Sequence, residues 1–219
     1  MTDFELNTLL ANEGFTTIEA QRAARQAIED AGLTRSRKMH VSGVKLPRIR
    51  MVLEEQFVKT CPHPVCRELI ERRRKGRRVV VVAYGDCELC EGSDNLRAAR
   101  RFVVLANGSR TKRVVVVGGS PSTRGELDEL RTGGIELRLV DGTARTTGER
   151  AERDLEWADV VLVWGSTQLD HKVSALYTDP RGPYRRKVVS VARRGVAALL
   201  DAGAEHIERG TTLAGEVGA

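Results

Sequence analysis

The chain has 219 residues, of which 41% are hydrophobic and 30% are charged, and its formal net charge is +6 at pH 7. This length suits one large or two small domains with a buried core, and the composition indicates a soluble globular protein. No apolar run approaches the roughly 20 residues that a membrane-spanning helix needs. The first ten residues, MTDFELNTLL, lack the basic region and cleavage site of a signal peptide. We therefore expect a cytoplasmic protein without a membrane segment.

The positive charge is unevenly placed. The chain has 36 Lys and Arg residues and 30 Asp and Glu residues. Residues 1–80 hold 16 of the cations and 10 of the carboxylates, which leaves 20 of each for residues 81–219. Clustered cations suit a polyanion, because neutralised phosphates release their counterions. A solvated basic face is the alternative for a single run, and two runs favour nucleic acid as partner. The expected contacts are Arg35, Arg37, Lys38, Lys45, Arg48 and Arg50, followed by Arg72, Arg73 and Arg74.

Residues 1–60 show the periodicity of three short helices. A first helix is expected over residues 4–10. Thr16 and Glu19 have the spacing of a capping box for a second helix, which Gly32 would end. Pro47 suits the first turn of a third, with Ile49, Val52, Leu53 and Phe57 on its apolar face. Three short helices of which the third is basic resemble a helix-turn-helix in outline, as other small helical bundles do.

All four cysteines fall within a stretch of thirty residues, at Cys61, Cys66, Cys87 and Cys90. Two closely spaced pairs about twenty residues apart suit a tetrahedral Zn²⁺ ion, because each pair supplies two ligands. Four thiolates close the coordination shell, so we expect structural rather than catalytic zinc. His63 is an alternative to Cys61, or a further ligand.

Two other interpretations of the cysteines stay open. The order of strand, Cys87-x2-Cys90 and helix is also that of thioredoxin-like redox proteins, although it leaves Cys61 and Cys66 unexplained. Disulfide bonds are the second alternative, but a cytoplasmic setting keeps thiols reduced.

From residue 78 onward, apolar β-branched runs alternate with amphipathic segments. Continuous apolar strands with helices between them predict a parallel sheet that is covered on both faces. We therefore expect an α/β fold with a small Rossmann-like sheet, preceded by the helical region and the zinc site. The expected strands cover residues 79–84, 114–119, 135–140, 159–165 and 187–192, and the expected helices cover 95–106, 122–131, 147–157, 169–177 and 195–207.

Ligands of such sheets bind where the strands end, and three loops there have suitable residues. Gly118 and Gly119 let the backbone approach a ligand, and Ser120 and Thr123 follow them. This loop suits a phosphate or carboxylate, or it is simply a tight turn with a helix cap. It lacks the GxGxxG and Walker spacings. Asp141 ends the next strand, where it would accept a hydrogen bond from a ribose hydroxyl or cap the turn.

A third loop gathers several polar groups from Ser166 to Lys172. Asp170 beside His171 would orient the imidazole or raise its pKa, and Lys172 would meet an anion. These three residues are the candidates for acid–base catalysis. A cap or surface role for His171 is the alternative, and the sequence leaves open whether the protein is an enzyme.

The segments VVVVGGSPSTRGELDEL, IELRLVDG and ADVVLVWGSTQLDHKVSALY resemble a bacterial Rossmann-like family that is catalogued as a domain of unknown function. The resemblance covers about residues 113–202, and it implies site roles for Gly118, Gly119, His171 and Lys172. Family members commonly have Ser where this chain has Asp170. The segment CELCEGSDN also resembles the zinc-knuckle lead-in of similar bacterial proteins.

We divide the chain into a helical basic region (1–60), a zinc-knuckle linking region (61–92), a Rossmann-like domain (93–209) and a tail (210–219). The leading hypothesis is a zinc-stabilised, regulatory nucleic-acid-binding protein whose α/β domain binds a ligand or self-associates. The alternative is an enzyme or sensor for a nucleotide-like or phosphorylated small molecule, bound at the Gly118–Gly119 loop and His171. A homo-oligomer is compatible with either.

Overall fold

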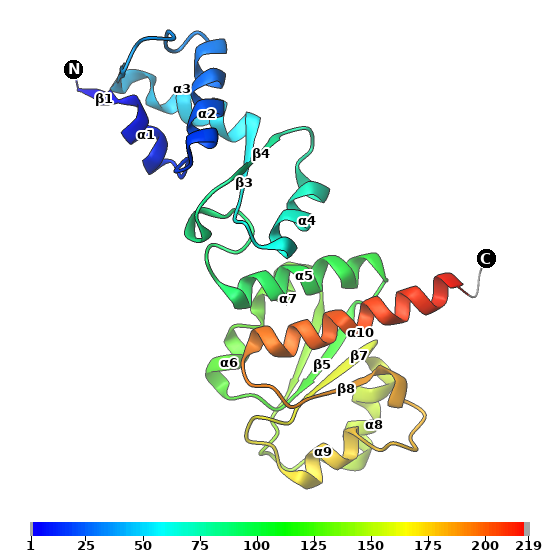
Figure 1. Cartoon of the computed structure of the whole chain (residues 1–219). Helices are drawn as coiled ribbons and strands as arrows, with labels where there is room; N and C mark the ends of the chain where they lie inside the picture. Colours follow the sequence, from blue (N-terminus) through cyan, green and yellow to red (C-terminus); the bar gives the residue numbers. More distant parts are fainter. Residues whose placement is uncertain (1, 217–219) are drawn as a thin grey trace. The chain divides into compact units, whose positions relative to one another are not determined.

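The computed structural model describes residues 2–216, with side chains as far as residue 210. The chain divides into two compact units, Met1–Ser93 and Asp94–Ala219 (Figure 1). No helix of the described residues is both long and apolar enough to cross a bilayer.

The first unit is built from short elements. Its helices are α1 (Leu6–Asn12), α2 (Ile18–Asp30), α3 (Leu46–Gln56) and α4 (Pro64–Arg73). Strands β1 (Asp3–Glu5) and β2 (His40–Ser42) pair antiparallel, and β3 (Phe57–Thr60) and β4 (Arg78–Val81) pair parallel. One apolar core joins α1, α2, α3 and the two parallel strands.

The three expected N-terminal helices exist, with shifted ends. Residues 3–5 form β1, so α1 starts only at Leu6. The cap of α2 is Thr17 rather than Thr16, because the Thr17 side chain accepts a hydrogen bond from the Ala20 N–H. Helix α3 ends at Gln56, and Phe57 belongs to β3 rather than to the helix face. The strand expected at 79–84 pairs with β3 in this unit and not with the larger sheet.

The second unit is a four-stranded parallel sheet between two layers of helices (Figure 1), as the sequence predicts. Its strands are β5 (Arg113–Val117), β6 (Glu136–Val140), β7 (Val160–Trp164) and β8 (Val188–Val191), in the spatial order β6-β5-β7-β8. Helices α5 (Asp94–Gly108), α7 (Asp128–Thr132) and α10 (Val196–Glu216) belong to one core, and α8 (Gly148–Trp157) and α9 (His171–Tyr177) to the other.

The residues of β5 alternate between these two cores. Val114 and Val116 join the layer of α5, α7 and α10, whereas Val115 and Val117 join the layer of α8 and α9. A strand that is buried on both faces needs apolar residues at every position, which explains the run VVVV. Helix α10 continues to Glu216, where the sequence predicts a tail from residue 210.

The order β6-β5-β7-β8 places a topological switch point between β5 and β7. The connection from β5 to β6 includes α7 on one face, and the connection from β6 to β7 is α8 on the other. The register places Val117 beside both Val140 and Val163, so these strands end level with one another. Loops that leave the sheet in opposite directions at such a point open a crevice for ligands.

Candidate metal centre and ligand cavity

The parallel pair β3–β4 brings the two cysteine pairs to one edge. Cys61 directly follows β3, and Cys66 lies in the first turn of α4. Cys87 and Cys90 follow β4 after the short 3-10 turn η2 (Tyr84–Asp86). Because both strands end at the same edge, residues about twenty positions apart in sequence become neighbours in space.

Two hydrogen bonds between Glu88 and Lys59 hold the second cysteine pair against β3. The Glu88 N–H donates to the Lys59 carbonyl at 3.1 Å, and the Lys59 N–H donates to Glu88 Oε1 at 3.0 Å. The Glu91 N–H donates to the Cys87 carbonyl, and Glu91 and Gly92 both have positive φ angles, which turns the chain back. The turn that carries Cys87 and Cys90 is therefore built onto the strand that leads to Cys61.

The four sulfur atoms form a compact cluster. They all lie within 4.8 Å of one another, and Cys61 Sγ is 3.8 Å from Cys90 Sγ. Four sulfurs at about 2.3 Å from a tetrahedral ion would lie about 3.8 Å apart. A disulfide needs only about 2.05 Å between its sulfurs, and none of the four cysteines is in one. The cluster therefore has the geometry of a single-ion metal site.

The surroundings of the sulfurs favour thiolates at some positions and oppose them at others. Burial raises the pKa of the Cys61 and Cys66 thiols. Burial also opposes ionisation of Cys87, but N–H groups of Cys61, Cys90 and Leu89 point at its sulfur and lower its pKa to about 7. Four buried thiolates cannot coexist without a cation, whereas a coordinated metal ion keeps its thiols deprotonated.

His63 is not a member of this cluster. It caps α4, where its Nδ1 accepts a hydrogen bond from the Val65 N–H at 3.3 Å. The ligand set that the structure brings together consists of the four cysteines that the sequence predicts.

A polar cavity of about 430 Å³ lies at the carboxyl ends of β5, β6 and β7. All three loops that the sequence indicates contribute to it. Of the predicted ligand-binding residues, Gly119, Ser120, Thr123 and Asp141 line the cavity. They are joined by Pro121, Arg124, Thr143, Thr167 and Gln168.

Gly118 lies behind the cavity, where the loops pack against each other. Its φ angle is +101°, and a Cβ atom there would lie 2.8 Å from Thr167 Oγ1. The Gly119 N–H donates to the same Thr167 oxygen at 3.0 Å, and Thr167 donates to the Trp164 carbonyl at 2.7 Å. Thr167 thus ties the loop after β5 to the loop after β7.

Asp141 is the carboxylate of the cavity, and its contacts hold it in place. Its carboxylate accepts hydrogen bonds from the Thr143 N–H at 2.9 Å and the Thr143 hydroxyl at 2.8 Å, and it pairs with the Arg124 guanidinium at 3.3 Å. These contacts, the Thr143 N–H foremost, lower the pKa of Asp141 to about 2. Arg124 also donates to the Gly119 carbonyl, so it connects the loops after β5 and β6.

The remaining candidates of the third loop lie elsewhere. Ser166 donates to the Arg193 carbonyl at 2.8 Å, and it does not line the cavity. Asp170 caps α9 by accepting from the Lys172 N–H at 2.7 Å. His171 and Lys172 are exposed, and neither lines the cavity. Thr167 and Gln168 are the members of this loop that face it.

The sequence does not single out five of the residues that line the cavity: Pro121, Arg124, Thr143, Thr167 and Gln168. Thr143, Thr167 and Gln168 belong to loops that the sequence indicates, so their position after a strand could have identified them. No sequence signal pointed to Arg124. It reaches the cavity because the chain folds so that its guanidinium contacts the Gly119 carbonyl and Asp141.

The first unit carries the expected basic residues on its surface. Arg35, Arg37 and Lys38 are exposed, and no carboxylate of the described residues pairs with them. Lys45 donates to the Leu33 carbonyl, and Arg48 is exposed. Arg50, Arg72 and Arg74 form ion pairs with Glu13, Glu68 and Glu71, and Arg73 is exposed.

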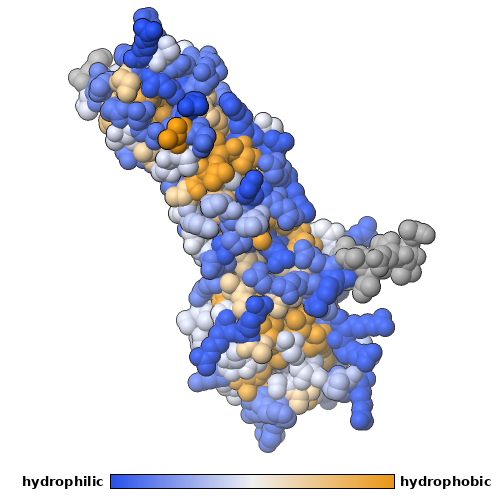
Figure 2. All heavy atoms as spheres, in the orientation of Figure 1, coloured by the Kyte–Doolittle hydropathy of each residue, from blue (hydrophilic) through white to orange (hydrophobic). Residues whose placement is uncertain are grey.

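The boundary at Ser93 changes the balance of charge. Asp86, Glu88 and Glu91 fall within the first unit, which therefore has 16 cations against 13 carboxylates, and the second unit has 20 against 17. Both units are equally basic overall, so the first differs only in the local clustering of its cations. It also exposes Met39 and Val44 beside them, and Figure 2 shows apolar atoms at its surface among hydrophilic ones.

No family model matches the chain, and neither does any curated protein.

Proposed function

We propose that the α/β unit binds a nucleotide-like small molecule in the cavity at the ends of β5, β6 and β7. The observation that carries this proposal is the meeting of three strand-end loops around one cavity at the switch point of the sheet. A volume of about 430 Å³ lies within the usual size range of small-molecule sites.

The side chains of the cavity suit a ribose. Asp141 follows β6, the second strand of this unit, which is where Rossmann-like proteins place the carboxylate that accepts from ribose hydroxyls. It stays ionised at neutral pH, because its pKa is about 2. The hydroxyls of Ser120, Thr123 and Thr143 and the Gln168 amide supply further donors and acceptors. Arg124, which pairs with Asp141, also lines the cavity, so a carboxylate for hydroxyl donors and a guanidinium for an anionic group lie side by side.

The proposed role is binding, as in a sensor. Acid–base catalysis by His171 has no geometric support, because the ring is exposed and is not among the residues that line the cavity.

Equilibrium titration with the four ribonucleoside 5′-monophosphates and their 2′,3′-dideoxy analogues tests this proposal. We expect at least one ribonucleotide to bind, and its dideoxy analogue and the Asp141→Asn variant to bind about ten- to a hundredfold more weakly, the value of one or two hydrogen bonds to a charged group. His171→Ala should bind like the parent chain. Equal binding of both sugars, or a loss confined to His171→Ala, would contradict the proposal.

We propose nucleic-acid binding by the first unit as a second function. It is favoured by Arg35, Arg37 and Lys38, which are exposed within residues 31–53, a stretch without a carboxylate. Their charges are available to phosphates, whereas that of Arg50 is already paired with Glu13 at 2.6 Å.

This difference gives a matched control. A variant with Arg35, Arg37 and Lys38 all changed to Gln should bind duplex or single-stranded nucleic acid more weakly, and its plot of log affinity against log salt should flatten by about 0.7–0.9 per lost contact. Arg50→Gln should change that slope little. An affinity that does not depend on salt would overturn the assignment.

The proposed cofactor is one structural Zn²⁺ ion on Cys61, Cys66, Cys87 and Cys90. A set of four thiolates in tetrahedral spacing suits zinc and closes the shell against substrate. A redox role would require a partly exposed thiol, whereas all four cysteines are at most 1% exposed. Four reduced cysteines also fit the cytoplasm as the proposed location.

A further inference from the structure

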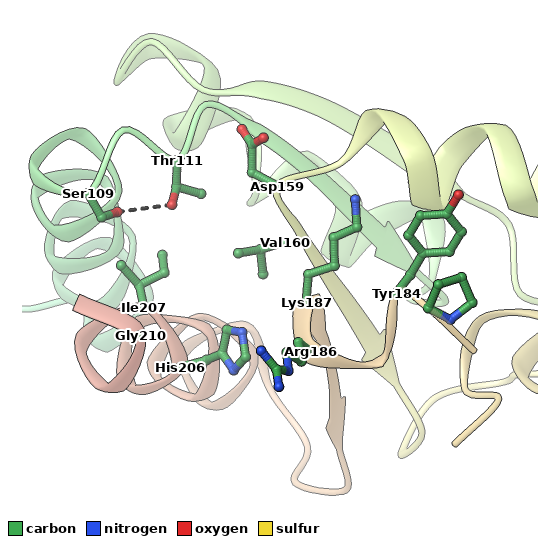
Figure 3. A pocket seen from close by; sticks show the side chains of 11 residues that line it. Ser109, Thr111, Asp159, Val160, Tyr184, Arg186, Lys187, His206, Ile207 and Gly210 are labelled. Atoms are coloured by element: carbon green, nitrogen blue, oxygen red, sulfur yellow. Dashed lines mark hydrogen bonds between the residues drawn. The ribbon is translucent and has the colours of Figure 1, made fainter. Parts of the chain in front are cut away.

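A second cavity of the α/β unit lies at the opposite edge of the sheet, where the strands begin. Its volume is about 490 Å³. It is lined by Thr111 before β5, Asp159 before β7 and Lys187 before β8, together with His206 and Ile207 of α10 (Figure 3). Nothing in the nucleotide proposal uses these residues.

The one carboxylate that lines this cavity is already neutralised. Asp159 Oδ1 pairs with the Arg113 guanidinium at 2.8 Å. Asp159 Oδ2 accepts from the N–H groups of Lys112 and Arg113, both at 2.9 Å. Asp159 therefore holds the start of β5 against the start of β7, and its charge is compensated within the protein.

Neither Lys187 nor Arg186 forms an ion pair with a carboxylate of the described residues. Lys187 Nζ donates to the carbonyl oxygens of Ala158 at 2.7 Å and Glu156 at 3.4 Å, and no carboxylate of the described residues forms an ion pair with it. Burial lowers its pKa, against the opposing influence of Asp159. Arg186 lies at the cavity too, exposed and without a carboxylate partner in the described part of the chain.

Part of the cavity wall is apolar. Val160 and Ile207 line it and are themselves 4% and 5% exposed. The Tyr184 ring stands beside Lys187, with Nζ 5.0 Å from the ring centroid. The Ser109 and Thr111 hydroxyls bond each other at 2.9 Å on the far side, as Figure 3 shows. Apolar side chains with two cations beside them that form no ion pair suit an apolar body that carries an acidic group.

We propose that this cavity is a second ligand site, which binds small aromatic or aliphatic carboxylates through Lys187 and Arg186. The ammonium, held by two carbonyls beside the cavity, meets the carboxylate, and Val160, Ile207 and the Tyr184 ring contact the apolar body. The site is independent of the nucleotide cavity, because the two lie at opposite edges of the same sheet.

The test compares 2-naphthoate with its neutral isostere 2-naphthamide on the full chain, followed by NMR of the backbone amides of Ser109, Thr111 and Val160. Naphthoate should bind and shift these amides, and naphthamide should bind about tenfold or more weakly. Lys187→Met keeps the aliphatic stem and removes the charge, and Arg186→Gln removes the second charge. Both should weaken naphthoate binding by about tenfold or more.

Arg185→Gln is the matched control, because it removes the same charge from an exposed neighbour that does not line the cavity. It should bind naphthoate like the parent, and so should Asp141→Asn, which alters only the other cavity. If Lys187→Met fails to fold, the result for Arg186→Gln tests the proposal instead. Arg186 is exposed, so its replacement should not disturb the fold. Equal binding of the two probes, an equal loss in Arg185→Gln, or no shift of these amides at millimolar naphthoate would overturn the proposal.

Discussion

Gly118 stands where the loops after β5, β6 and β7 cross, and a side chain has no room there. Besides the Thr167 oxygen, a Cβ atom would meet the Trp164 carbonyl at 3.3 Å, and the positive φ angle strains any other residue. Gly118→Ala should therefore destabilise the α/β unit by about 1–3 kcal/mol. Gly125→Ala is the control, because Gly125 has open space around it. Denaturant unfolding measures the free energy of unfolding of both variants. Equal stability of the two would contradict the close packing of the loops at Gly118.

Asp141 should titrate far below an ordinary aspartate. Its pKa lies at about 2 instead of 3.8, because the Thr143 N–H and hydroxyl and Arg124 stabilise the charged form. A lowered pKa in the folded state means that this carboxylate stabilises the fold above pH 3.8 and that its contribution is lost as the pH falls through about 2.

Carboxyl NMR measures this titration directly. Thr143→Val removes the hydroxyl donor and should move the midpoint upward, whereas Arg145→Gln, at an exposed neighbour, should leave it nearly unchanged. A parent midpoint close to 3.8 would show that the contacts of Asp141 do not form.

The chemical type and position of single residues predicted part of the ligand cavity. Which other residues line it depends on the direction in which their side chains point. Asp141 is the first residue after β6 and Gly119 the second after β5, so the ends of those strands fix where they lie. Ser166 and His171 are as polar as Thr167 and Gln168, but the loop turns them away from the cavity. Which members of a loop face inward depends on the turn and its neighbours, and sequence spacing does not encode that.

Between the elements α8, α9 and β6 lies a buried polar group, Asp154. Its oxygens accept from the Tyr177 hydroxyl and the Arg138 guanidinium, both at 3.1 Å, and the Arg138 group stacks over the Trp157 ring at 3.8 Å. Burial and the nearby Asp154 charge raise the pKa of Tyr177, which keeps its hydroxyl a donor at neutral pH.

Tyr177→Phe leaves one oxygen of Asp154 without its donor and should destabilise the α/β unit by about 1–3 kcal/mol. Tyr184→Phe removes the same atom from an exposed contact with Glu156, and it should leave the unfolding free energy unchanged. Thermal unfolding of the two variants separates them. A Tyr177→Phe variant as stable as the parent would show that the Asp154 contact contributes nothing.

Long elements with an uninterrupted pattern were predicted best. All four strands of the larger sheet follow from their apolar runs, to within two residues at each end. Strands β1, β2 and β3 were missed, because three or four residues carry too little periodicity and depend on their partners. The strand β4 was predicted, but its pairing with β3 could not be, since residues 57–60 also continue the helical pattern of α3.

For the molecule as a whole, the two units differ in what stabilises them. The α/β unit has two cores around a sheet that is covered on both faces. The first unit has one core and two sheets of only two strands each. Two-stranded sheets are marginal by themselves, and a structural zinc site in a small fold contributes on the order of 10 kcal/mol. The first unit should therefore depend on the proposed zinc ion, and the second should not.

Native mass spectrometry of the chain, combined with hydrogen exchange before and after chelation, tests this dependence most directly. We predict one zinc ion per chain, and chelation should release amide protection in residues 57–93 while β5–β8 keep theirs. A single iron ion would instead absorb visible light, which zinc does not. A metal-free chain whose four thiols react like free cysteines, with the first unit still protected, would contradict the metal centre.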